Sequence, residues 1–387
     1  SFEQVLRQVT ATYVYGLTAT PIRKDGHQPI IFMQCGKIRF TSDAKNQMEN
    51  QGFKRLLIPR FTSFRSIISD RKTYVQITQE LSEDKVRNEF VMEDVKAAIQ
   101  KGRTPLVLTT RTAHVKVLAQ MLMPFADHVI QLIGADSAKE KRLALQNLQS
   151  IPTSESLVVV ATGKYVGEGF DYPRLDTLFL TMPIAWKGNV EQYAGRLHRE
   201  YEGKSEVCIY DYVDIRVPLC DSMYRKRLKG YARAGYGKNV TSPAPDKKSQ
   251  ELIYEQNNYE AAFRNDLAKA KHSVVIAVPK VKFKYKPSIM SALANLLHDG
   301  VSVVVHVKEE GANELELSNA GMDVVCNKEQ TLQCAIIDKS IVWYGNINFF
   351  GHNSETNNVM RIADYKIANE MMEILYSATE NKANETR

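Results

Sequence analysis

Two arginines and a glutamine form the most specific chemical pattern in this sequence. Arg196 and Arg199 lie three positions apart and Gln192 lies four positions before the first of them, so a helix would place all three on one face. A planar guanidinium group suits the spread charge of a phosphoryl group in transfer. The pattern therefore predicts a site that stabilises phosphate, with a solvated basic helix as the structural alternative.

A second pattern follows the apolar run that begins at Leu157. Gly163, Gly167 and Gly169 would let the backbone approach a phosphate or a ribose closely, and Asp171 adds a hydrogen-bond acceptor beside them. In doubly wound sheets, ligands bind beyond the carboxyl ends of the strands, which is where this segment lies. An ordinary structural loop would tolerate the same glycines, so spacing alone leaves both interpretations open.

These residues need a scaffold, and the hydrophobic pattern predicts one. Short apolar runs alternate with amphipathic segments, which indicates buried parallel strands joined by crossover helices. The runs occupy residues 106–109, 129–133, 157–161, 178–180 and 207–210. The amphipathic segments occupy residues 84–101, 112–123 and 138–148, and Ser137 is the expected N-cap of the last one. We predict one doubly wound α/β domain over residues 76–235.

The flanking parts of the chain have different patterns. Residues 1–75 contain one expected strand, over 13–17, and are predicted to be the C-terminal remnant of a preceding domain. Residues 236–250 lack periodicity and are predicted to be a linker. The pattern resumes in a second α/β domain over residues 251–387. Its helices are expected from about 250 and over 288–298, and its strands over 274–278, over 301–305 and near 324, 335 and 342.

Composition limits the partners and the compartment. A net charge of +7 and a pI near 8.9 permit binding to a phosphate backbone. The sequence has no run of roughly 18 apolar residues, so no membrane partner is expected. Its five cysteines are scattered and form no C-x-x-C pair, which disfavours a metal site and fits a reducing cytoplasm. We therefore expect a cytoplasmic protein, of a bacterial or phage-like intracellular kind, without a structural metal.

Four segments, in order, resemble motifs III, IV, V and VI of the superfamily-two helicases. The likeness is greatest to the DEAD/DEAH-like members that are related to XPB and to type III restriction motors. The segments are residues 16–23, 109–112, 161–171 and 192–199. The resemblance covers residues 1 to about 235 and implies two RecA-like domains. This chain would hold the second of them and the end of the first.

The resemblance also implies a role for individual residues. It makes Arg199 the arginine finger, with Arg196 its partner, and such a finger is typically worth roughly 10³- to 10⁵-fold in rate. The residues carried over are Glu168, Gly169 and Asp171 for ATP binding; Gln192, Arg196 and Arg199 for catalysis; Thr18, Ala19 and Thr20 for coupling; and Arg111, Thr112, Gly134, Thr162 and Lys164 for nucleic-acid binding.

The sequence departs from these helicases in what it lacks. A complete motor needs a G-x-x-x-x-G-K-[ST] loop to cradle phosphates and a DExx carboxylate pair for Mg²⁺, and neither is present. The single Gly-Lys-Ser, at residues 203–205, follows motif VI and is interpreted as a surface turn. We therefore expect a fragment that binds no ATP or Mg²⁺ alone and hydrolyses no ATP. Its expected partners are nucleic acid and the missing first RecA-like domain, in cis or in trans.

Two basic clusters are further candidates for nucleic-acid binding. In the first, cations alternate with apolar or aromatic residues, as an extended strand with one charged face would show. Its cations are Lys280, Lys282, Lys284 and Lys286. The second cluster covers residues 225–233 and would form a basic helix. Both are predicted to track phosphates without sequence preference, with a solvated face as the alternative.

The C-terminal domain carries a second resemblance, to the phospholipase D-like signature H-x-K-x4-D-x6-G-S-x-N. Asp338, Gly345 and Asn348 match this signature, whereas Thr331 replaces its histidine nucleophile and Gln333 replaces its lysine. The resemblance implies a degenerate phosphodiesterase site. Active members pair two such units, which leaves a homodimer through this domain open.

Together these patterns predict the C-terminal part of an ATP-dependent helicase or translocase that acts on nucleic acid, with DNA favoured over RNA. The first alternative is a non-catalytic nucleic-acid-binding module, which the missing phosphate loop favours. The second is a phospholipase D-type phosphodiesterase or nuclease, which Thr331 and Gln333 disfavour.

Overall fold

The computed structural model divides the chain into two units, Ser1–Gln51 and Gly52–Arg387. The described residues are 8, 10–16, 28–40, 53–66, 73–134, 137–167, 170–184, 189–236, 238–239, 250–251, 253–281, 287–309, 311–328, 330–351, 353–354 and 357–385. In the described part of the first unit, helix α2 spans Gln28–Cys35 and residues 13–16 are in no strand. The strand predicted there is wrong, because no strand is described in that unit to pair with it.

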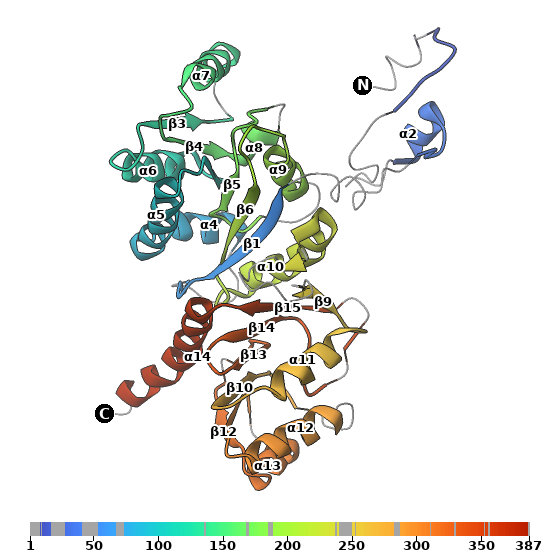
Figure 1. Cartoon of the computed structure of the whole chain (residues 1–387), viewed down its shortest axis with the longest axis vertical. Helices are drawn as coiled ribbons and strands as arrows, with labels where there is room; N and C mark the ends of the chain where they lie inside the picture. The colour runs from blue at the N-terminus through green and yellow to red at the C-terminus, as the bar shows by residue number, and fades with distance from the viewer. Residues whose placement is uncertain are drawn as a thin grey trace. The chain divides into compact units, whose positions relative to one another are not determined.

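The first sheet of the larger unit consists of parallel strands in the order β1-β6-β5-β2-β4-β3 (Figure 1). These strands are β1 (Lys54–Phe61), β2 (Pro105–Thr109), β3 (His128–Leu132), β4 (Leu157–Thr162), β5 (Thr177–Leu180) and β6 (Glu206–Val213). The helices are α4 (Tyr74–Glu83), α5 (Lys85–Gln100), α6 (Thr112–Leu122), α7 (Ala138–Ser150), α8 (Gly163–Gly167), α9 (Asn189–Leu197), α10 (Pro218–Tyr231) and the π-helix η1 (Ala232–Tyr236). The predicted parallel α/β sheet is confirmed.

Local sequence explains where these elements lie and begin. Strands β2 and β4 are buried along their whole length, as continuous apolar runs predict for the middle of a parallel sheet. Ser137 caps α7 through a capping box with Glu140, which confirms the predicted N-cap. Thr73 and Gln76 form the same arrangement at the start of α4.

Strand β1 corrects the predicted domain boundary at residue 75. Lys54–Phe61 pairs in parallel with β6 along its whole length, so it belongs to the sheet predicted to begin at residue 76. The apolar pattern of the sequence does not identify this strand. It lies at the edge of the sheet, buries only alternate side chains and carries Arg55, Pro59 and Arg60. These residues interrupt the apolar run that identifies the central strands.

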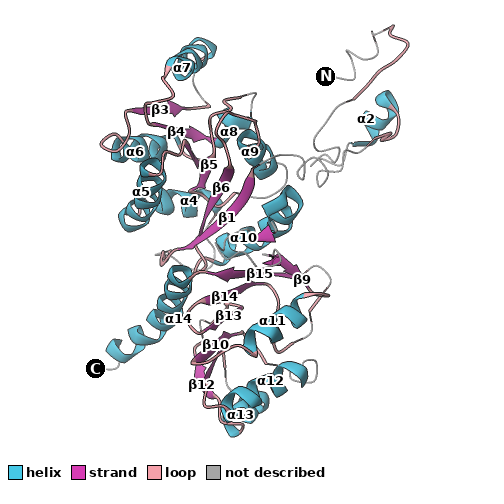
Figure 2. Ribbon diagram, in the orientation of Figure 1, coloured by secondary structure: helices cyan, strands magenta, loops and turns pink. Residues whose placement is uncertain are grey.

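The second sheet is mixed, with the strand order β12-β11-β10-β13-β14-β15-β9. Its strands are β9 (Ile253–Glu255), β10 (Ser273–Ala277), β11 (Ser302–Val307), β12 (Asp323–Cys326), β13 (Cys334–Ile337), β14 (Ile341–Gly345) and β15 (Asn358–Ala363). Its helices are α11 (Tyr259–Leu267), α12 (Pro287–His298), α13 (Ala312–Asn319) and α14 (Tyr365–Glu385), as Figure 2 shows.

The start of this second domain differs from the prediction. A helix was expected from about residue 250, but β8 (Gln250–Glu251) and β9 come first and α11 begins only at Tyr259. Strand β8 pairs with β7 (Lys238–Asn239), and β9 pairs with β15, so these short segments are fixed by partners distant in sequence. Most of the predicted linker, residues 240–249, lies outside the described residues.

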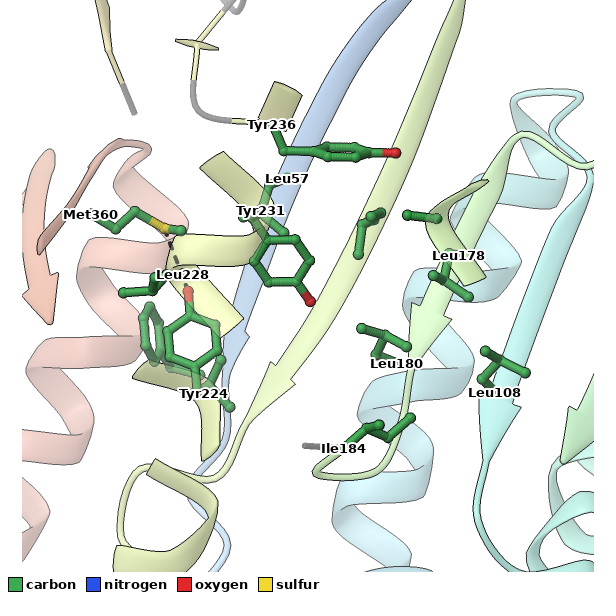
Figure 3. Close-up of a cluster of buried hydrophobic side chains, with 14 of the residues drawn as sticks. Leu57, Leu108, Leu178, Leu180, Ile184, Tyr224, Leu228, Tyr231, Tyr236 and Met360 are labelled. Carbon is green, nitrogen blue, oxygen red and sulfur yellow. Dashed lines mark hydrogen bonds between the residues drawn. The ribbon is translucent and has the colours of Figure 1, made fainter. Parts of the chain in front are cut away.

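The two sheets share one apolar core, which Figure 3 shows around α10. The Tyr224 hydroxyl of α10 donates to the Met360 sulfur of β15 at 3.4 Å. The Phe61 ring of β1 meets the Tyr344 ring of β14 edge to face, with 5.0 Å between the ring centroids. The second sheet therefore packs directly on elements of the first.

Three buried arginine–aspartate pairs lie inside this larger unit. In each pair the guanidinium donates two hydrogen bonds to one carboxylate, and both side chains are at most 8% exposed. The pairs are Arg87–Asp214, Arg227–Asp211 and Arg361–Asp266. Such forked geometry is the arrangement in which a buried charge is best compensated.

A partly buried cluster where α14 meets β1 should make stability depend on pH. Arg60 binds Glu370 of α14 at 2.6 Å and Asp94 of α5 at 2.8 Å. Burial raises the pKa of Glu370 to about 7, although Arg60 acts in the opposite direction. Since an unfolded glutamate titrates near pH 4.3, the folded chain holds the extra proton between about pH 4.3 and pH 7. This group should therefore lower the free energy of unfolding as the pH rises through that window.

Replacing Glu370 with glutamine removes the titration and tests this expectation. Urea unfolding between pH 4.5 and pH 7.5 should show that the stability of the wild type, relative to Glu370→Gln, falls as the pH rises. A difference that is independent of pH would contradict the assignment.

Candidate functional site

The carboxyl edge of the parallel sheet gathers several of the predicted site residues. Because β2, β3 and β4 run in parallel, the segments that follow them meet at one edge. Gly134 follows β3 and Thr162 ends β4, and the Gly134 amide donates to the Thr162 hydroxyl at 2.8 Å. These two predicted nucleic-acid contacts therefore lie together. Lys164, at the start of α8, has a side chain outside the described part of the structure.

Arg111 and Thr112 lie at the same edge, where β2 leads into α6. Thr112 is exposed at the first position of α6, and Arg111 is half-buried with Nη1 3.3 Å from the Val75 carbonyl. Beneath them, His114 bonds the Thr109 hydroxyl at 2.9 Å. Burial lowers the pKa of His114 to about 3, so the imidazole is neutral. No sequence pattern identifies this histidine, because its second partner, Asn88, lies 26 positions away and becomes a neighbour only in the fold.

The contact between α8 and α9 gives Gly163 a structural role. A Cβ atom at Gly163 would lie only 2.4 Å from the hydroxyl of Tyr193 in α9. Gly163 therefore lets two helices approach closely, and the predicted approach of its backbone to a ligand stays a prediction. Glu168 and Gly169, two of the predicted ATP ligands, lie outside the described residues, as do the coupling residues Thr18, Ala19 and Thr20.

Asp171 and Arg199 face each other beside this helix contact. The Arg199 Nε lies 3.3 Å from Asp171 Oδ1, and each side chain is about half exposed (53% and 47%). Such an exposed pair is worth at most about 1 kcal/mol, so the guanidinium can exchange this partner for a phosphate at little cost. Gln192 is also exposed on α9.

Arg196 differs from Arg199 in its surroundings. It lies in the last turn of α9 and is half-buried, and its Nε has no hydrogen-bond partner among the described residues. A buried N–H without an acceptor is unfavourable by about 1–3 kcal/mol. An anion placed against this end of α9 would supply the missing acceptor.

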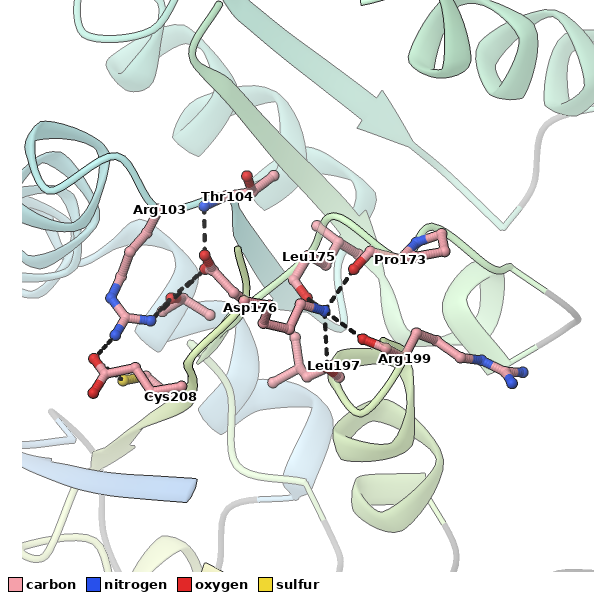
Figure 4. Close-up of polar contacts among 11 residues, drawn as sticks. Arg103, Thr104, Pro173, Leu175, Asp176, Leu197, Arg199 and Cys208 are labelled. Atoms are coloured by element: carbon pink, nitrogen blue, oxygen red, sulfur yellow. Dashed lines mark hydrogen bonds and ion pairs between the residues drawn. The ribbon is translucent and has the colours of Figure 1, made fainter. Parts of the chain in front are cut away.

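The predicted surface turn at residues 203–205 has the expected shape but an unexpected side chain. Gly203 adopts a φ of +79°, as a tight turn requires. Lys204, however, is half-buried and donates to four backbone carbonyls that lie on two segments. Figure 4 labels the residues that supply these carbonyls. The interpretation of this segment as a simple surface turn is therefore incomplete.

The basic helix predicted over residues 225–233 does not present a continuous charged face. Arg227 is fully buried and bound to Asp211, and Arg225 is paired with Asp221. Lys226, on the same helix, is exposed. Arg225 and Arg227 are therefore held by carboxylates and not free to track phosphates, whereas the role predicted for the rest of the cluster stays a prediction.

The first basic cluster can be followed at one position. Lys280 is exposed after β10, whereas Lys282, Lys284 and Lys286 lie outside the described residues. Their role in nucleic-acid binding therefore stays a prediction.

Gln333 and Asn348, two residues of the predicted degenerate phosphodiesterase site, are engaged by neighbouring backbone groups. Strands β13 and β14 form an antiparallel pair. Gln333, just before β13, and Asn348, after β14, lie at the same end of this pair. In the amide orientation that satisfies its neighbours, Gln333 donates to the carbonyls of Asn346 and Ile347. Asn348 donates to the Lys280 carbonyl and accepts from a backbone amide. Thr331 is exposed nearby.

Asp338 lies at the other end of this strand pair. It accepts hydrogen bonds from the amides of Lys271, His272 and Ser273, which hold the pKa of its carboxyl below the usual range although burial acts the other way. Asp338 therefore holds the backbone at the start of β10 and lies apart from Thr331, Gln333 and Asn348.

The described part of the chain shows neither a candidate metal site nor a membrane-spanning helix. There, no group of three or more histidine, cysteine, aspartate or glutamate residues could hold a metal ion. None of the described helices is long and apolar enough to span a membrane.

Two solved structures are distantly similar to the chain. The crystal structure of T4 UvsW has a TM-score of 0.38 and 16% identity, and the match covers 47% of this chain and 39% of that one. The phospholipase D family member Nuc from Salmonella typhimurium has a TM-score of 0.29 and 20% identity, over 33% of this chain and 91% of that one.

Sequence similarity is partial and points to viral proteins, and no family model matches the chain. The transcript termination protein A18 of Myxoma virus is 27% identical over 153 residues, which is 38% of this chain and 31% of that protein. The putative helicase 161L of Invertebrate iridescent virus 6 is 24% identical over 240 residues, which is 59% of this chain and 51% of that protein. The chain thus spans between about a third and a half of the length of these relatives. Over part of its length, it is similar to viral helicase-like proteins.

Proposed function

We propose that this chain is the arginine-bearing part of an ATP-dependent helicase or translocase that acts on nucleic acid, with DNA as the expected substrate. The observation that carries the proposal is the exposed pair of Arg199 and Asp171 beside the half-buried Arg196, at the end of α9. A cation that can change partners next to an unsatisfied guanidinium N–H suits a phosphoryl group. The similarity to a putative viral helicase supports the same function.

The chemistry of this site determines what the rest of the motor must supply. The donors on this chain, Arg196 and Arg199, suit phosphate oxygens and not Mg²⁺. A segment with the G-x-x-x-x-G-K-[ST] loop and the DExx pair, in cis or in trans, would hold the β- and γ-phosphates and Mg²⁺. When bound, ATP supplies the phosphoryl group that is transferred to water.

The residues of this chain would act when the two parts close. Arg199 would leave Asp171 and donate to the γ-phosphate, and Arg196 would gain the acceptor that its Nε lacks. Guanidinium donors aimed at developing charge in a site without water lower the barrier to transfer. Arg111, Thr112, Gly134 and Thr162 would meanwhile contact the nucleic-acid backbone, so that closing and opening move the grip along the strand.

The alternatives rest on different parts of the chain. A non-catalytic nucleic-acid-binding module would use the same sheet edge without turnover. A phospholipase D-type phosphodiesterase would need a nucleophile and a cation near Asn348, but Thr331 and Gln333 stand there and Gln333 is bound to backbone carbonyls. The observations therefore favour the helicase proposal over the nuclease.

The proposal is tested by ATPase activity. We use "reassembled motor" for this chain mixed with a helicase segment that carries both the G-x-x-x-x-G-K-[ST] loop and the DExx pair. DNA should stimulate ATP hydrolysis by the reassembled motor, and this chain alone should hydrolyse none. Absence of turnover in the mixture, with DNA binding retained, would favour the non-catalytic module.

Binding of DNA by the chain alone can be tested separately. Affinity for fluorescent single- and double-stranded DNA should fall steeply as salt rises, because bound counterions are released from the phosphates. Arg111→Ala should weaken binding for all sequences and reduce the slope of log K against log salt by about 1. Lys269→Ala, which removes an exposed cation that follows α11 and lies in no predicted site, is the matched control. A binding constant independent of salt would contradict phosphate contact.

A further inference from the structure

Lys204 occupies a site made of backbone oxygens. Its Nζ lies 2.5 Å from the carbonyl oxygen of Pro173, 2.7 Å from that of Leu175, 2.8 Å from that of Arg199 and 3.1 Å from that of Leu197 (Figure 4). A lysine ammonium has three donors and no acceptor, so these four carbonyls use all of its donors.

The four carbonyls come from two segments that the candidate site must align. Pro173 and Leu175 follow Asp171 on the way to β5, whereas Leu197 ends α9 and Arg199 follows it. The last carbonyls of a helix have no partner within the helix, and the negative end of its dipole attracts a cation. Lys204 therefore caps α9 and ties its end to the segment that carries Asp171.

The local backbone explains how the side chain reaches this position. Gly203 has a φ of +79°, and the Lys204 amide donates to the Tyr201 carbonyl at 3.0 Å. This turn reverses the chain between α9 and β6, so the side chain of Lys204 points back toward the residues that precede it.

We propose that Lys204 is a positioning residue that holds Arg199 in register with Asp171, so that the Arg199 guanidinium meets the transferring phosphoryl group correctly. The inference rests on the proposed function. Lys204 does not contact the site itself: its ammonium binds the backbone of Arg199, and the Arg199 side chain pairs with Asp171. A misplacement of a reacting group by about 1 Å can lower a rate on the order of 10²-fold.

Among the described residues, Asp176, Arg103 and His198 are charged or titratable groups that lie around Lys204. Asp176 attracts the ammonium and is itself bonded to the Thr104 amide and close to Arg103. His198 stays neutral, because burial lowers its pKa to about 3. Burial lowers the pKa of Lys204 to about 8, with Asp176 acting in the opposite direction.

This environment gives a readout that a purely structural role would not produce. Above about pH 8 the amine loses a proton and its charge, so its hold on the carbonyls weakens and kcat of the reassembled motor should decline. The free energy of unfolding should not fall together with kcat. The folded pKa lies below the unfolded value of about 10.4, so the unfolded state binds more protons in this window and stability should rise with pH.

The decisive experiment compares Lys204→Met with Lys269→Met, which removes an exposed lysine that follows α11, in the reassembled motor. Lys204→Met should lower kcat about 10- to 100-fold and leave the KM for ATP within about threefold, because Lys204 does not touch the nucleotide. Lys269→Met should change neither value. Lys204→Arg, whose charge persists above pH 8, should recover part of kcat and lose the decline at high pH.

The outcomes separate this inference from the proposed function. If the wild-type motor turns over and Lys204→Met has an unchanged kcat, the inference is wrong and the proposed function stands. If the wild-type mixture is inactive, both fail together. Amide hydrogen exchange of residues 197–201 in the chain alone should speed up in Lys204→Met, and unchanged exchange would also overturn the inference. Melting of each variant detects a general loss of folding, in which case Lys204→Arg carries the comparison.

Discussion

Replacing Arg199 with alanine is expected to lower ATP turnover by the reassembled motor by roughly 10³- to 10⁵-fold. The guanidinium, which is paired with Asp171 through an exposed contact, would stabilise negative charge that develops on the γ-phosphate. Steady-state turnover with saturating ATP and DNA measures the effect. The chain should remain folded, because an ion pair this exposed contributes at most about 1 kcal/mol to stability.

The matched control for this prediction is Arg142→Ala. Arg142 is an exposed arginine of α7 and lies outside the candidate site. Its replacement removes the same charge from the chain as the replacement of Arg199. Turnover by Arg142→Ala should equal that of the wild type. A similar fall in both variants would mean that net charge matters and that Arg199 is no arginine finger.

The second large effect should be on stability. Replacing Arg227 with methionine leaves Asp211 as a buried carboxylate whose remaining side-chain donor is the Tyr231 hydroxyl, and breaking such a pair costs about 3–5 kcal/mol. Arg227 also donates to the Ile184 carbonyl at 2.9 Å, which loses its partner. Urea unfolding of the chain should show a midpoint well below that of the wild type.

Two further variants show whether the effect belongs to the pair. Lys226→Met, one position earlier and exposed, should change the free energy of unfolding by no more than about 0.5 kcal/mol. Adding Asp211→Leu to Arg227→Met removes the uncompensated charge and should restore part of the loss. If the double variant is less stable than the single one, Asp211 is held by Tyr231 and not by the arginine.

Sequence patterns predicted the parts of the fold in which one physical signal dominates. The central strands β2 and β4 are buried on both faces, so their apolar runs identify them directly. The N-cap at Ser137 followed from side-chain chemistry within a few residues. Strand β1 could not be predicted in the same way, because pairing with β6 and contacts with α14 decide its place, and neither is local.

The candidate site was predictable in its order along the chain but not in its contacts. The spacing of Gln192, Arg196 and Arg199 predicted that one helical face carries all three. Helix α9 carries Gln192 and Arg196 but ends at Leu197, so Arg199 lies beyond it. The inward turn of Lys204 was hidden, because a lysine after a glycine usually lies in water. The burial of Arg227 was equally hidden, since its partner Asp211 lies 16 positions away on a strand.

Strand β1 also has a consequence for how the chain is made. Lys54 leaves the ribosome long before Glu206, its partner in β6, and at 5–20 residues per second the delay is roughly 8 to 30 s. The opposite contact of β1, with Glu370, arrives later still. Strand β1 must therefore wait, with its backbone unpaired, until β6 has been synthesised, and its side-chain contact with α14 forms later still.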